Sequence, residues 1–162
     1  DLARAAERAL RLRQVNFRDV WQVAMALEPL CASLAAQSVT AEELAALERN
    51  LERTRAVVKR GESPVDVDIE FQALVAAASH NPALLLARGP ISLLMRAGYA
   101  AIAPKLPQSG SRLLKVHQQI VAALQQRDAA AAEAAMRKHM QDYQRGCAVA
   151  GLDMSLPIPA ST

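Results

Sequence analysis

One stretch of the chain, from Asp66 to Pro82, restricts the possible folds most strongly. Its apolar residues recur at helical spacing, and Asn81-Pro82 follows at the point where a helix must stop. Asp68 and Gln72 are four residues apart, so they share one face of the expected helix, beside its apolar stripe. We therefore expect both polar side chains to reach into a packed interior rather than into water. The stripe consists of Val67, Phe71, Leu74, Val75 and Ala78.

The rest of the chain has the same helical character. Hydrophobic residues make up 52% of the 162 positions but aromatic residues only 3%, and this composition favours helix over sheet. Periodic apolar segments with short loops between them predict an all-α fold, an antiparallel bundle of six or seven helices. We expect residues 1–15 to be a linker or residual helix of a longer protein, residues 16–150 to form the helical domain, and residues 151–162 to be a tail.

Short local signals mark where the helices begin and end. Thr40 and Glu43 form a capping box, and Gly61 is expected to end the helix that this box opens. Pro29 predicts a bend near Ala26, and Gly89-Pro90 predicts either a broken helix or two helices between residues 82 and 106. The expected N-caps are Asn16, Thr40, Ser63, Ser111 and Asp128.

Charge and cysteine usage restrict the class of protein only weakly. The net charge is +3 and is spread along the chain, so it indicates neither a nucleic-acid surface nor its absence. Cys31 and Cys147 have no CxxC spacing, and we expect free thiols in a reducing, cytoplasmic compartment. No apolar run reaches the ~18 residues of a transmembrane helix, so no membrane partner is expected.

Two histidines lie on apolar helix faces, and each needs partners for both ring nitrogens. His117 is surrounded in its helix by leucine, isoleucine and valine, and His139 by methionine and tyrosine. With Asp68 they form a set of two imidazoles and one carboxylate, which suits Zn²⁺, Ni²⁺, Mn²⁺ or Fe²⁺. The residues alone leave two interpretations open: a metal site, or core histidines that hydrogen-bond to Asp68. His80 lies at a helix end and is expected only to interact with the helix dipole.

Three classes of function are compatible with this set of residues. The first is a ligand-sensing domain, the second a metal-dependent hydrolase or oxygenase on a helical bundle, and the third a helical interaction module with no ligand. The sequence contains no glycine-rich phosphate loop and no Gly-x-Ser-x-Gly elbow, so an enzyme is not expected. A cavity beside Asp68, His117 and His139 would favour a sensor over an interaction module.

Five segments of the chain, taken in order, have a pattern that can be compared with known families. They are Phe17–Ala36, Thr40–Leu44, Asp68-Ile-Glu-Phe-Gln72 with Ser79-His-Asn-Pro82, Val116–Leu124, and Asp128 with Met136-Arg-Lys-His-Met140. Together they resemble the FadR-like C-terminal (FCD) domain of GntR-type transcription regulators. The resemblance implies an all-helical domain that forms homodimers and binds a small, organic-acid-like effector in an internal cavity. It also implies operator DNA bound through an N-terminal winged helix-turn-helix outside this sequence.

Many members of the resembled family hold a divalent metal with one aspartate and three histidines inside the bundle. By position, the resemblance implies Asp68, His117 and His139 as metal ligands, with Gln72 where the third histidine is expected. An amide is a poor ligand for transition metals, so Zn²⁺, Ni²⁺ or Mn²⁺ is expected to bind more weakly than in those members.

A second departure from the family concerns the first long helix. Ala24 stands at a position where members often carry an arginine, which weakens the case for a carboxylate clamped by a guanidinium. Arg96 is the expected substitute. The expected effector contacts are Asp68, Gln72, Arg96, Tyr99, His117 and His139.

Overall fold

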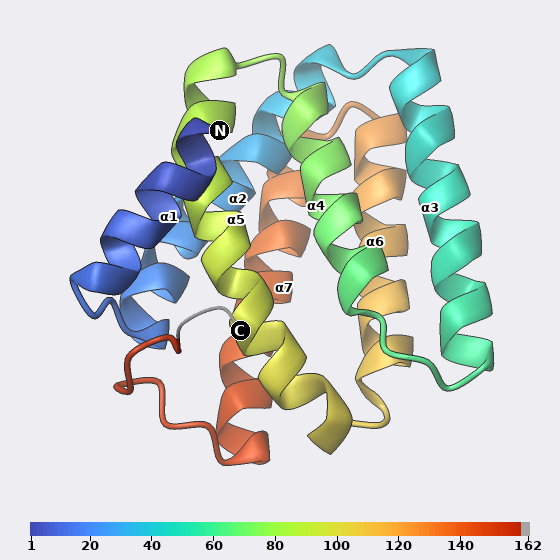
Figure 1. The fold of residues 1–162 in the computed structure, drawn as a ribbon. Helices are drawn as coiled ribbons and strands as arrows, with labels where there is room; N and C mark the ends of the chain where they lie inside the picture. The colour runs from blue at the N-terminus through green and yellow to red at the C-terminus, as the bar shows by residue number, and fades with distance from the viewer. Residues whose placement is uncertain (160–162) are drawn as a thin grey trace.

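The helices form an antiparallel bundle in which consecutive helices run in opposite directions (Figure 1). This computed structural model describes residues 1–159. Within them it contains seven α-helices, one 3₁₀ turn and no strand, which confirms the predicted all-α fold. None of these helices combines the length and apolarity that a bilayer crossing requires. They are α1 (Leu2–Leu12), α2 (Phe17–Ser38), α3 (Ala41–Lys59), α4 (Val65–Ala78), α5 (Pro82–Ile102), η1 (Ala103–Lys105), α6 (Ser109–Gln125) and α7 (Ala129–Ala150).

The core lies around α2 and α7, which share the most extensive interface in the bundle. Helices α4, α5 and α6 pack around this pair, α3 covers α4 and α6, and α1 covers α5 (Figure 1). The indole N–H of Trp21 on α2 donates to the Met140 carbonyl on α7 at 2.8 Å. Because the interior is mainly aliphatic, the few polar side chains inside it are conspicuous. The largest fully buried apolar side chains include Phe71, Leu47, Leu94, Ile120, Leu124, Met136 and Met140.

Most of the predicted helix ends are confirmed. Asn16 and Thr40 each form a reciprocal capping box, at the starts of α2 and α3. Asp128 caps α7 by accepting a hydrogen bond from the Ala131 amide. Gly61 follows α3 with a φ of 66°, a conformation that glycine adopts without strain.

Two predicted helix starts are wrong. Helix α4 begins at Val65 with Pro64 as its N-cap, one residue later than predicted, although the Ser63 Oγ accepts a 3.5 Å hydrogen bond from the Val65 amide. Helix α6 begins at Ser109, before the predicted cap Ser111. The N-cap residues of both helices form no side-chain cap hydrogen bond within residues 1–159. Both starts therefore depend on tertiary packing, which a local sequence signal does not report.

Helix α5 is continuous through Gly89-Pro90, so the predicted break is wrong. An interior proline costs about 3 kcal/mol, and the burial of Leu84 and Ile91 on either side of it offsets that cost. Gly89 lets α1 approach closely, since a Cβ added there would lie 3.1 Å from the Ala3 Cβ. Helix α2 contains Pro29 in its interior and remains one helix from Phe17 to Ser38; the bend predicted near Ala26 stays a prediction.

The segment after α7 is packed, although its sequence predicts a tail. Met154 and Ile158 are 7% and 5% exposed. The Ile158 amide donates to the Val15 carbonyl at 3.0 Å, and the Arg18 amide donates to the Met154 carbonyl at 2.9 Å. Residues 152–159, called here the C-terminal strap, therefore hydrogen-bond to the junction between α1 and α2 and hold it in place. Residues 160–162 of the predicted tail lie outside the described residues.

Candidate metal and effector site

Three helices bring Asp68, His117 and His139 together in the interior. Asp68 lies in the first turn of α4 and is 1% exposed, on the face that also buries Phe71. His117 on α6 places its Nε2 3.0 Å from Asp68 Oδ1, and His139 on α7 places its Nε2 2.9 Å from the same oxygen. The His117 ring stacks on the Phe71 ring with centroids 3.7 Å apart, which fixes its orientation.

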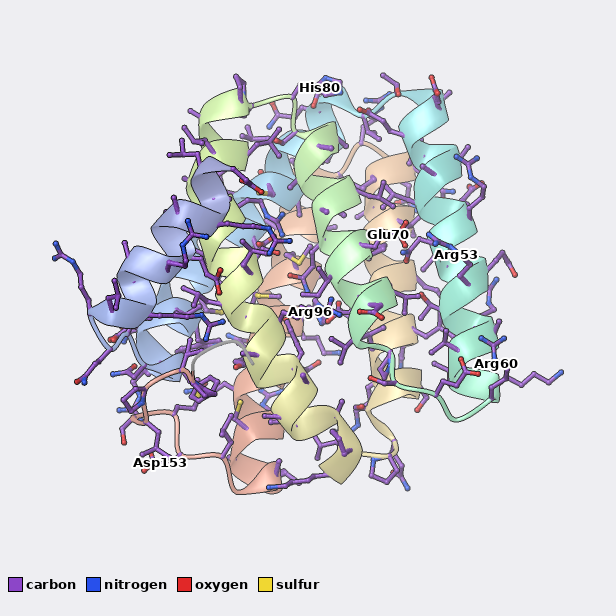
Figure 2. All side chains as sticks on the ribbon, in the orientation of Figure 1. Arg53, Arg60, Glu70, His80, Arg96 and Asp153 are labelled. Carbon is purple, nitrogen blue, oxygen red and sulfur yellow. The ribbon has the colours of Figure 1, made fainter. Side chains whose placement is uncertain are left out.

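Gln72 and Tyr99 belong to the same network. The Gln72 Nε2 donates to Asp68 Oδ1 at 3.1 Å and to the Tyr99 hydroxyl at 3.2 Å, and it lies 3.4 Å from His139 Nε2. Arg96, in contrast, lies on the exposed side of α5, where it pairs with Asp66 at the surface (Figure 2). The structure thus gathers five of the six residues predicted to contact an effector and leaves Arg96 outside the group.

The charges in the network are distributed unequally. Burial raises the pKa of the Asp68 carboxyl, but the charge of His139 and hydrogen bonds from both imidazoles more than offset this and hold that pKa well below its usual range. Burial lowers the pKa of His117 to about 4, and its hydrogen bond to Asp68 opposes only part of that effect. Burial also acts to lower the pKa of His139, yet the Asp68 charge raises it above its usual value. At neutral pH the cluster therefore contains a carboxylate, a neutral His117 and a His139 biased toward its charged form.

The donor set fits a divalent transition metal. One ligand atom each from Asp68, His117 and His139 lies within 4.8 Å of the others, and all three residues are buried. Asp68 Oδ2 and His117 Nδ1 have no hydrogen-bond partner among residues 1–159. A buried carboxylate oxygen without a partner is costly unless a cation or a donor meets it. Metals bind neutral imidazole and ionised carboxylate, so a metal ion would bind Asp68 and His117 in their favoured forms and would displace a proton from His139.

A cavity of about 400 Å³ adjoins this cluster. It is lined by Asp68, Tyr99 and His139 and extends between the end of α5, η1, the start of α6 and α7. Its volume lies within the roughly 300–1,000 Å³ typical of small-molecule sites. Space beside Asp68 weighs against an interaction module with only structural polar residues.

Sequence reasoning missed a second buried polar pair. Glu28 on α2 and Arg88 on α5 are 2% and 6% exposed, and Arg88 Nε donates to Glu28 Oε1 at 2.9 Å. A signal was present, because Glu28 lies between Ala24 and Cys31 on the buried face of α2, at helical spacing. Burial raises the pKa of Glu28, and the Arg88 charge opposes this. The charges of His139 and Asp68 also act on Glu28, so the pair is electrostatically coupled to the site.

The domain is all-helical, and a buried carboxylate–imidazole cluster lies beside a cavity of small-molecule size. The sequence matches the model of the FCD domain over residues 19–142, so the chain belongs to the FCD domain family. The family is a regulatory, non-enzymatic domain of GntR-type transcription regulators, which confirms the predicted class and the expectation that the chain is not an enzyme.

Among solved structures, the chain is similar to "Streptococcus agalactiae GntR", with 25% sequence identity and a TM-score of 0.69. The similarity covers 80% of this chain but only 58% of that protein. A search of curated proteins found no match.

Proposed function

We propose that this chain is the effector-sensing, dimerising domain of a GntR-type transcription regulator. A small anionic effector enters the cavity beside Asp68, and its binding shifts a homodimer between arrangements with different affinity for operator DNA. DNA contact is assigned to a winged helix-turn-helix outside this sequence. The observation that carries the proposal is the cluster of Asp68, His117 and His139, of which Asp68 and His139 line one end of a cavity of small-molecule size.

In this proposal Asp68, His117 and His139 hold one divalent metal ion. When bound, such an ion supplies a Lewis-acidic anchor for carboxylate or hydroxyl oxygens. Asp68 supplies the negative charge, and Phe71 stacking keeps His117 in position. Gln72 and Tyr99 supply hydrogen-bond groups beside the ligands.

The metal is tested by elemental analysis of the purified protein after dialysis against Zn²⁺, Ni²⁺ or Mn²⁺. We expect about one equivalent in the wild type and a loss of the metal in His117→Ala and Asp68→Asn, since each change removes one of only three ligands. His80→Ala is the matched control, because His80 is an exposed histidine that pairs with Glu43. Gln72→His is expected to tighten binding by adding a fourth ligand.

Two results separate the parts of this proposal. Absence of metal in the wild type after dialysis against all three ions would refute the metal site. Native mass spectrometry then tests the sensor independently, because a small molecule retained by a dimer supports the cavity as an effector site. A monomer with no retained molecule and no response to any organic acid would refute the sensor.

A further inference from the structure

The two ends of the cavity differ in chemistry. Asp68, Tyr99 and His139 form the inner end, and each is at most 8% exposed. The walls between this end and the surface are mostly apolar and come from α5, η1, α6 and α7. They include Ile102, Ala103, Leu106, Leu113, Val116 and Val149. A ligand that fills this space must therefore present an apolar body along most of its length.

The outer end of the same cavity carries three cations from three different elements. Lys105 follows α5 in η1, Arg112 lies in the first turn of α6, and Arg145 lies on α7; all three are exposed and line the cavity. Asp142 is the one carboxylate near them among the lining residues that the structure describes. This outer end, called here the mouth of the cavity, therefore has an excess of positive charge, which attracts anions.

Arg112 is the cation most available to a ligand. Arg145 already pairs with Asp142 at 3.1 Å, and the Lys105 Nζ donates to the Ala150 carbonyl at 3.4 Å. Arg112 forms no ion pair or hydrogen bond through its guanidinium within residues 1–159. A guanidinium offers two parallel N–H donors, the arrangement that a carboxylate accepts in bidentate fashion.

We propose that the effector is a two-ended amphipathic acid, with a polar group at the Asp68 end, an apolar body along the walls and a terminal carboxylate bound by Arg112 at the mouth. This inference rests on the proposed sensor function and adds the chemical class of its ligand. It assigns to α6 the cation that the first long helix lacks at Ala24. It also gives the apolar walls a role, since they select for ligands with a hydrocarbon spacer.

The test compares octanedioate with octanoate, which have the same chain length but two and one carboxylates. The full chain is first dialysed against Zn²⁺, Ni²⁺ or Mn²⁺. Isothermal titration calorimetry then measures the binding of each acid to the wild type, Arg112→Gln and Lys115→Gln. We expect the diacid to bind the wild type about five- to tenfold more tightly than the monoacid, as a charge-assisted contact at a partly exposed position allows. Arg112→Gln should abolish this preference. Lys115→Gln should keep it, because Lys115 is an exposed cation of the same helix that does not line the cavity.

The preference should also shrink as the salt concentration rises, since the mouth is exposed to solvent. Equal affinities for the two acids, or the same preference in Arg112→Gln as in Lys115→Gln, would overturn the inference and leave the sensor proposal intact. Failure of both acids to bind a protein that still holds its metal would overturn the inference as well, without touching the metal site. Circular dichroism of the two variants confirms that both exposed substitutions leave the fold unchanged.

Discussion

At the residue scale, the site is organised around a single oxygen atom. Asp68 Oδ1 lies within 3.1 Å of nitrogen atoms of Gln72, His117 and His139. Burial raises the pKa of Asp68, but the charge of His139 and the hydrogen bonds from both imidazoles stabilise the ionised form more strongly, so this pKa is low. The other oxygen has no hydrogen-bond partner among residues 1–159, which leaves one acceptor position free for the proposed metal ion.

The Glu28–Arg88 pair yields the first prediction. Arg88→Met leaves a buried carboxylate without its cation and should destabilise the protein by about 3–5 kcal/mol, whereas Glu28→Leu/Arg88→Met should cost much less. Because burial already raises the pKa of Glu28, the loss in Arg88→Met should diminish as the pH falls and the carboxyl becomes protonated. Urea denaturation at neutral and mildly acidic pH measures both effects. Equal losses in the single and double variants would contradict this interpretation.

Gly98 gives a second prediction at this scale. A Cβ at this position would overlap the Tyr143 hydroxyl and lie 2.9 Å from the Tyr143 Cζ. Gly98→Ala should therefore cost about 1–3 kcal/mol through overpacking and displace a ring that lines the cavity. Tyr143→Phe removes the clashing oxygen, so the double variant should recover part of the lost stability. A double-mutant cycle from thermal unfolding measures this coupling, and strict additivity would argue against the contact.

What the sequence reveals about single residues depends on their surroundings in the helix. The convergence of Asp68, His117 and His139 could be anticipated because each stands out on an apolar stripe. The Arg88 interaction could not, since a lone charge on a stripe identifies no partner before the helices are packed. Arg96 follows the buried Met95 directly in sequence, but successive residues of a helix point in different directions, so Arg96 lies at the surface and pairs with Asp66, and Arg88 is the buried cation of α5.

At the element scale, helix ends are predictable only where a side chain closes them. The Thr40 amide donates to Glu43 Oε2 at 2.9 Å, and the Glu43 amide donates to Thr40 Oγ1 at 3.2 Å. Both bonds are local, so four residues of sequence specify them. The starts of α4 and α6 have no such bonds, and the continuity of α5 depends on burial. The boundaries of these helices follow from contacts between helices, so a short segment of sequence does not predict them.

The capping box at the start of α3 yields a prediction about pH. Slight burial raises the pKa of Glu43, but hydrogen bonds from the Thr40 amide and from His80 lower it below its usual value. A carboxyl with a depressed folded-state pKa contributes stability that is present above its unfolded pKa and is lost as the pH falls through its folded pKa. Glu43→Gln keeps the hydrogen bond to Thr40 but does not titrate. Between mildly and strongly acidic pH, the free energy of unfolding of the Glu43→Gln variant should therefore fall less than that of the wild type.

Thr40→Ala removes the other half of the box and should cost about 1 kcal/mol at neutral pH, and less at acidic pH, because the Thr40 hydroxyl also donates to the ionised Glu43 carboxylate. Urea unfolding followed by circular dichroism measures all three proteins. Parallel curves for the wild type and Glu43→Gln over the acidic range would rule out a role for the Glu43 charge in the cap.

At the scale of the whole molecule, α7 connects the candidate site to the first helices of the chain. It carries His139 at its middle and continues through Gly151 into the C-terminal strap, which hydrogen-bonds to the α1–α2 junction. In the proposed regulator this junction lies between the sensor and the DNA-binding module. A shift of α7 on effector binding would therefore reach that junction through a continuous, packed segment. The sequence could not reveal this path, because the strap has no periodicity and its partners lie more than a hundred residues away.

The strap provides the last prediction. Ile158 is 5% exposed, so Ile158→Ala should cost about 2–4 kcal/mol, whereas Leu156→Ala should change stability by about 0.5 kcal/mol or less because Leu156 is 51% exposed. Hydrogen exchange localises the effect: loosening the strap should speed exchange at the Phe17 and Arg18 amides, which donate to strap carbonyls. If the strap also transmits the signal, metal or acid binding should slow exchange at these two amides in the wild type and not in Ile158→Ala. Unchanged exchange at both positions on ligand binding would mean that α7 does not carry the response to this end of the molecule.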